Sequence, residues 1–84
     1  LDSSPMVRIN AIEAIMNSDS EEAPDLIRDC LKDEDKEVQK NALIAMYNLE
    51  GRDILDDVLL SKEYSDYLKQ EAQDLLNEYE ADDE

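Results

Sequence analysis

A pattern of about thirty residues occurs three times along this chain, and it constrains the fold more than any other feature. The three segments align without internal gaps: SPMVRINAIEAIM (4–16), DKEVQKNALIAMY (35–47) and SDYLKQEAQDLLN (65–77). Equivalent apolar positions hold Val7, Val38 and Leu68, and then Ala11, Ala42 and Ala72. Good helix N-cap residues precede each pattern, namely Ser4, Asp35 and Ser65. Because caps and apolar positions recur together, the sequence predicts a repeat architecture.

The apolar spacing within each segment predicts a helix. Apolar residues fall at i, i+4, i+7 and i+8, which is one face of a helix. Pro5 suits the first turn, and Gly51 suits a C-terminal stop. Shorter helical patterns lie between the segments, with Leu26, Ile27, Cys30 and Leu31 equivalent to Ile54, Leu55, Val58 and Leu59. We predict one domain over residues 1–80 with helices at 5–17, 21–32, 36–50, 52–61 and 66–80, then an acidic tail at 81–84.

The charge of the chain narrows its possible functions. Its 84 residues include 24 acidic and 8 basic side chains and no histidine, for a net charge of −16. Such acidity repels phosphate backbones and argues against nucleic-acid binding. No apolar run approaches the length of a membrane span. The single cysteine, Cys30, cannot form an internal disulfide, which favours a reducing, cytoplasmic location.

The loop and helix around residue 35 carry a family resemblance. The pattern L-x-D-x-D-x-x-V-x-x-x-A-x-x-A-M runs through Leu31, Asp33, Asp35, Val38, Ala42, Ala45 and Met46. It resembles the short HEAT-like repeat first described in phycobilisome lyases. The resemblance implies an all-α fold, an α-α superhelix of about two and a half helical hairpins. It also implies that Asp–Arg pairs tie adjacent repeats together. The acidic positions here are Asp2, Asp33 and Glu63, and Arg8 has Gln39 and Lys69 as its equivalents.

The first and last helices differ on the side opposite the predicted core stripe. The first helix carries apolar residues there, Ile9, Ile12 and Met16, whereas the last carries Gln70, Gln73, Asp74 and Asn77. A polar outer side is typical of a terminal capping repeat. We therefore predict the C-terminal portion of a longer solenoid, in a chain that begins at Leu1 rather than at methionine. The alternative is a complete small protein that self-associates through Ile9, Ile12 and Met16.

Partner binding is predicted on a ridge of the 5–17, 36–50 and 66–80 helices, which line the concave surface in the family that the chain resembles. The ridge positions are Glu13, Met16, Asn17, Lys40, Ile44, Tyr47, Asn48, Asp74 and Asn77. Ile44 and Tyr47 are apolar where a solvated face would be polar. They either pack between neighbouring helices or form an apolar anchor ringed by acids, which suits a protein partner with a basic segment.

Candidate catalytic groups are few. Cys30 lies on an apolar stripe and is expected to be a structural, buried thiol. Residues 33–37 lack the glycine and glutamate of a calcium loop, and Asp56 and Asp57 point in different directions on a helix. We predict no catalytic, cofactor or metal site. The leading function is a non-catalytic protein-interaction scaffold. The alternatives are a fragment of a bilin lyase or isomerase and a purely structural end cap.

Overall fold

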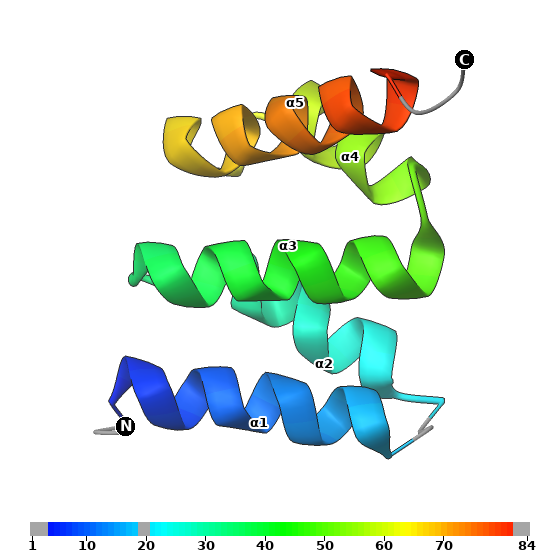
Figure 1. Cartoon of the computed structure of the whole chain (residues 1–84). Coiled ribbons are helices and arrows are strands. Elements are labelled where there is room, and N and C mark those ends of the chain that lie inside the picture. The colour runs from blue at the N-terminus through cyan, green and yellow to red at the C-terminus, as the bar shows by residue number, and fades with distance from the viewer. Residues whose placement is uncertain (1–3, 19–20, 82–84) are drawn as a thin grey trace.

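The computed structural model describes residues 4–18 and 21–81, which form five α-helices and no strand. They are α1 (Pro5–Asn17), α2 (Ala23–Cys30), α3 (Lys36–Glu50), α4 (Asp53–Leu60) and α5 (Asp66–Ala81). The helices α1, α3 and α5 lie side by side in one layer, with α2 and α4 behind them (Figure 1). This is the all-α arrangement of stacked helical hairpins that the repeat predicts.

The helix ends follow the sequence pattern closely. Helix α2 is shorter than the predicted range at both ends, α4 begins at Asp53, and α5 ends at Ala81. Ala81 is therefore the last residue of a helix rather than the first of the acidic tail, whose remaining residues lie outside the described part of the chain. Asp2, the acidic position of the first repeat, also lies outside it.

Equivalent side chains cap the N-termini of the three long helices. The Val7 amide donates to Ser4 Oγ at 3.3 Å. The amides of Glu37 and Val38 donate to Asp35 Oδ1 at 2.9 and 3.2 Å. The Leu68 amide donates to Ser65 Oγ at 3.1 Å. Each cap satisfies amides that have no partner within their helix, so the repeated cap residues fix where each long helix begins.

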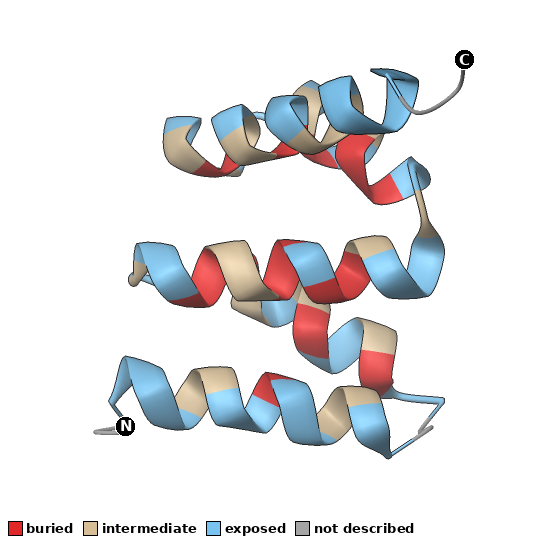
Figure 2. Cartoon of the chain, in the orientation of Figure 1, coloured by how far each residue is buried: buried red, intermediate tan, exposed pale blue. Residues whose placement is uncertain are grey.

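The hydrophobic core surrounds α3, which contacts each of the other four helices. Fully buried side chains come from α3, α4 and α5 and from α2 with the residue after it (Figure 2): Val38, Ala42, Leu43 and Met46, Ile54, Leu55 and Val58, Leu68 and Ala72, and Ile27 and Leu31. The small residues Ala42 and Ala72 allow close helix packing at the positions where the repeat predicts it. The core stripe is therefore confirmed for the second and third repeats.

Helix α1 departs from the predicted pattern. Val7 is 54 % exposed and Ala11 and Ala14 are exposed, whereas Ile12 is only 2 % exposed. Ile9 and Met16 are half-buried against the core. The prediction that Ile9, Ile12 and Met16 form an outward face for self-association is therefore wrong. The physical reason is that α1 packs on α3 through the side that carries Ile12, and no described helix covers its Val7 side.

Candidate functional site

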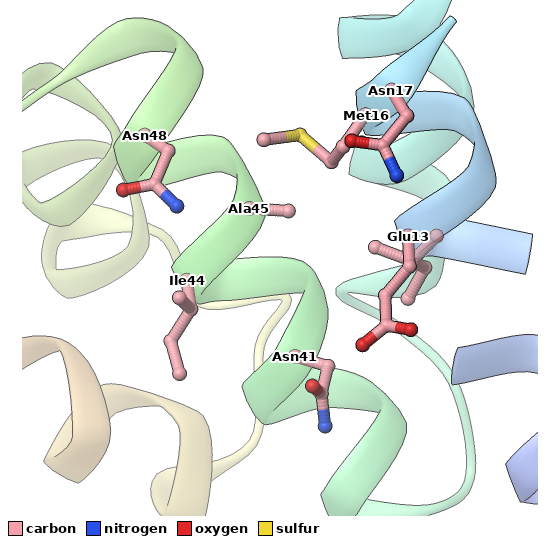
Figure 3. Close-up of a pocket in the computed structure, with 8 residues that line it drawn as sticks. Glu13, Met16, Asn17, Asn41, Ile44, Ala45 and Asn48 are labelled. Atoms are coloured by element: carbon pink, nitrogen blue, oxygen red, sulfur yellow. The ribbon is translucent and has the colours of Figure 1, made fainter. Parts of the chain in front are cut away.

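A groove between α1 and α3 is the candidate binding site. Its volume is about 370 Å³. Two helical turns from each side line it (Figure 3): Ile12, Glu13, Met16 and Asn17 of α1, and Asn41, Ile44, Ala45 and Asn48 of α3. On each helix, single residues or adjacent pairs recur three or four positions apart, so they share one face. The parallel contact of α1 and α3 thus aligns the two faces along a single groove.

The groove combines an apolar interior with polar edges. Met16 extends from α1 toward α3 beside Ala45, and Ile44 contributes a large apolar side chain that is 39 % exposed. Asn17, Asn41 and Asn48 supply amide donors and acceptors, and Glu13 supplies the one charge among the lining residues. This arrangement suits an apolar side chain in the groove with a basic group beside Glu13.

The structure brings some of the predicted ridge residues together and separates others. Glu13, Met16 and Ile44 line the groove, together with Asn17 and Asn48. Tyr47 packs against the hydrophobic core, as its helix-packing interpretation implies, and Lys40 is half-buried outside the groove. Asp74 and Asn77 lie on α5 outside the groove and accept hydrogen bonds from Gln70 and Gln73, both at 3.1 Å. The ridge is therefore not one continuous surface.

Three lining residues, Ile12, Asn41 and Ala45, are not among the predicted ridge positions. The sequence predicts Ile12 on the outer side of the first helix and Ala45 in the core stripe, and it predicts no role for Asn41. A usable signal existed, because Asn41, Ala45 and Asn48 recur at helical spacing beside Ile44.

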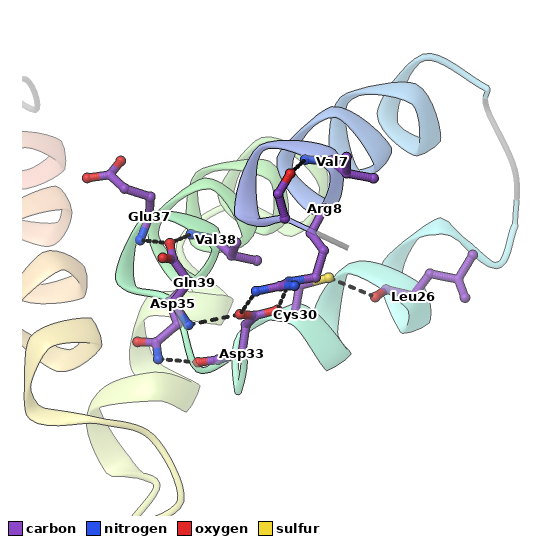
Figure 4. A network of polar contacts seen from close by, with 10 residues as sticks. Val7, Arg8, Leu26, Cys30, Asp33, Asp35, Glu37, Val38 and Gln39 are labelled. Atoms are coloured by element: carbon purple, nitrogen blue, oxygen red, sulfur yellow. Dashed lines mark hydrogen bonds and ion pairs between the residues drawn. The ribbon is translucent and has the colours of Figure 1, made fainter. Parts of the chain in front are cut away.

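A polar network links the N-terminal parts of the three long helices, and Figure 4 shows its part between α1 and α3. Arg8 binds Asp33 with two nitrogens, at 2.6 Å from Nε and 3.0 Å from Nη2. The Gln39 amide nitrogen donates to the Asp33 carbonyl, and its oxygen accepts from Ser65 Oγ at 2.8 Å. The Asp–Arg tie implied by the family resemblance is thus present at Arg8, and Gln39 replaces it with hydrogen bonds in the next repeat.

Ion pairs at the ends of the short helices add further links between repeats. Lys32 Nζ lies 2.7 Å from Glu63 Oε1, and Arg28 Nη2 lies 3.1 Å from Glu50 Oε1. The hydrogen bond between Lys32 and Glu63 raises the pKa of Lys32 and lowers the pKa of Glu63. These pairs are exposed, so they orient neighbouring repeats more than they stabilise them.

Cys30 lacks the surroundings of a nucleophile. Burial and the carboxylates of Asp33 and Asp29 raise the pKa of its thiol, and its Sγ lies 3.8 Å from the Leu26 carbonyl. A raised pKa disfavours the reactive thiolate. Within residues 4–18 and 21–81, no group of three potential metal ligands occurs. No helix in those residues is long and apolar enough to span a membrane.

The stacked hairpins and their shared caps define an α-helical repeat protein. The sequence model for HEAT repeats matches residues 1–77, and the chain belongs to this family. No curated protein sequence matches the chain. No solved structure matches it either.

Proposed function

We propose that this protein is a non-catalytic scaffold that binds a protein partner in the groove between α1 and α3. The observation that carries the proposal is the exposure of Ile44 inside a groove whose edge holds Glu13. A large apolar side chain left accessible in a concave site offers the kind of contact that anchors a peptide or a helix.

The charge of the chain indicates which partners the groove favours. With a net charge of −16, the protein attracts basic segments over a distance and repels acidic ones. Association with a basic partner should therefore be fast at low salt and slower as salt is added. We infer a partner segment with one apolar anchor and a lysine or arginine close to it.

A peptide selection tests this function. Peptides selected for binding from a random library should share an apolar residue flanked by lysine or arginine. Ile44→Ser should weaken their binding by about tenfold or more. Leu49→Ser is the matched control, because Leu49 is also an exposed apolar residue of α3 but does not line the groove. Equal losses for both variants, or selected peptides without basic residues, would contradict the proposal.

The polar outer side of α5 supports a second proposal, that this domain closes a longer helical stack at its C-terminal end. Gln70–Asp74 and Gln73–Asn77 hydrogen bonds cover that side with paired polar groups. In the purely structural version of this role, Ile44→Ser and Tyr47→Ser would leave function intact.

No described feature favours a bilin lyase fragment. A cytoplasmic location is also proposed, and the free thiol of Cys30 supports it.

A further inference from the structure

One repeat position crosses the three long helices on the side of the stack that carries the groove. The tenth residue of the three aligned segments is Glu13, Ile44 and Asp74 in turn. Helices α1, α3 and α5 lie side by side, and α3 contacts both of the others (Figure 1). Glu13 and Ile44 line the groove (Figure 3). Because the repeat relates α5 to α3 as it relates α3 to α1, Asp74 continues this line. We call the three residues the cross-stack row.

Both ends of the cross-stack row carry carboxylates without a basic partner. Glu13 and Asp74 are exposed, and Ile44 between them is 39 % exposed. Among the residues that the structure describes, no lysine or arginine forms an ion pair with Glu13 or Asp74. Asp74 accepts its hydrogen bond from the neutral amide of Gln70. The row therefore offers an apolar contact between two carboxylates that can bind cationic groups from outside.

The spacing of the cross-stack row indicates the shape of a segment that could contact all three residues. The axes of packed helices lie about 8–10 Å apart, and each step of the row covers about that distance. An α-helix returns to nearly the same face after seven residues, which is a rise of about 10.5 Å. In a β-strand, three residues also cover about 10 Å, but positions three apart point to opposite faces. A helix lying across the stack therefore matches the row.

We propose that the partner segment is a helix that crosses α1, α3 and α5, with an apolar residue at Ile44 and a lysine or arginine seven residues away on each side. One basic residue pairs with Glu13 and the other with Asp74. The proposal rests on the proposed binding function of the groove, and it adds Asp74 of α5 as a second charged contact outside the groove. The net charge of −16 also favours a basic helix over an acidic one.

A designed peptide tests the proposal. The probe is a helical peptide of alanine and glutamine with leucine at its centre and lysine seven residues before and seven residues after the leucine. It should bind the intact protein at low salt. In the control peptide both lysines are five residues from the leucine, which keeps the composition and charge but turns the lysines away from the face of the leucine. The control peptide should bind about fivefold or more weakly than the probe.

A charge reversal in the protein tests the contact with α5. Asp74→Lys should weaken binding of the probe by about fivefold or more. Glu80→Lys is the matched control, because it changes the net charge equally at an exposed position of α5 that lies outside the cross-stack row. It should change binding by less than about twofold. Since Asp74 and Glu80 are both exposed, both variants should fold.

The outcomes separate this proposal from that of the groove. Failure of the probe to bind, equal binding of the two peptides, or equal effects of Asp74→Lys and Glu80→Lys would overturn the crossing helix. If Ile44→Ser weakens binding of the probe while the two charge reversals act alike, the function of the groove stands and the contact with α5 does not. A probe that binds equally well to the Ile44→Ser protein would contradict the groove itself.

Discussion

Gly51, between α3 and α4, has a backbone conformation that other residues rarely adopt. Its φ of 73° and ψ of −151° lie in a region that is almost exclusive to glycine. A Cβ there would meet no atom within 4 Å. We expect Gly51→Ala to destabilise the protein by about 1–3 kcal/mol through backbone strain alone. Gly51→Asn should cost a similar amount, because this is not the left-handed helical region that asparagine tolerates. Urea unfolding would measure both, and rescue by asparagine would contradict this account.

Asp33 accepts hydrogen bonds from the backbone as well as from an arginine. Its Oδ1 accepts from Arg8 and also from the Asp35 amide at 2.9 Å. We therefore expect Asp33→Ala to cost about 2–3 kcal/mol and Arg8→Ala about 1 kcal/mol. A double-mutant cycle by chemical denaturation would measure the coupling between them, which should be about 1 kcal/mol. A coupling energy close to zero would contradict a contribution of the ion pair to stability.

The carboxyl of Glu63 should titrate below its ordinary range. The hydrogen bond and charge of Lys32 lower the pKa of this exposed group. A lowered pKa means that the pair contributes to folding above the ordinary pKa of glutamate, and that this contribution is lost as pH falls through the lowered value. NMR titration of Glu63 would measure the shift, and Lys32→Gln should return the pKa toward its usual value. An unchanged pKa in that variant would refute the pairing.

At the scale of the element, the repeat offers a matched pair of substitutions. Val7 and Val38 occupy the same repeat position, but Val7 is 54 % exposed and Val38 is fully buried. Val38→Ala should cost about 2 kcal/mol for lost burial and a cavity. Val7→Ala should change the free energy of unfolding by less than about 0.5 kcal/mol. Thermal or urea unfolding would measure both, and similar costs would mean that α1 is covered in solution.

The sequence predicts the helices better than it predicts their burial. Helical spacing and repeated caps are local features, so the five helices are predictable from residues close together in the chain. Burial depends on what lies across from each face. Val38 and Ala42 are buried because α3 lies among four other helices, whereas Val7 and Ala11 occupy the same repeat positions on α1 and are exposed. Ile12 was misplaced for the same reason, since its burial comes from contact with α3.

The groove is predictable only in part. Met16 and Ile44 stand out in the sequence, because a helix position that faces solvent favours polar residues and these two are apolar. Glu13 lies on the same predicted ridge. Their neighbours Asn41 and Asn48 are ordinary surface residues when each helix is considered alone. The distance between α1 and α3, which decides which of these residues face one another, depends on the packing of whole helices. The packing of whole helices also separates the groove from the predicted ridge residues on α5, Asp74 and Asn77.

At the scale of the whole molecule, self-repulsion of the −16 charge should oppose folding. Salt screens interactions between exposed charges beyond about 10 Å at 0.1 M. We expect the melting temperature to rise by at least about 4 °C between low and moderate salt, which corresponds to about 1 kcal/mol for a domain of this size. Calorimetry in sodium chloride would measure the rise. A flat or falling melting temperature would show that the exposed ion pairs outweigh the repulsion.

The two ends of the stack also determine how the molecule can polymerise. An open-ended fibre needs two complementary surfaces on every subunit, so that each added copy offers a new attachment point. Here the apolar surface exists at the α1 end, while the α5 end carries paired polar side chains. A copy that attached through its α1 end would find no matching partner at the α5 end of another. The difference between α1 and α5 therefore disfavours head-to-tail association of this domain.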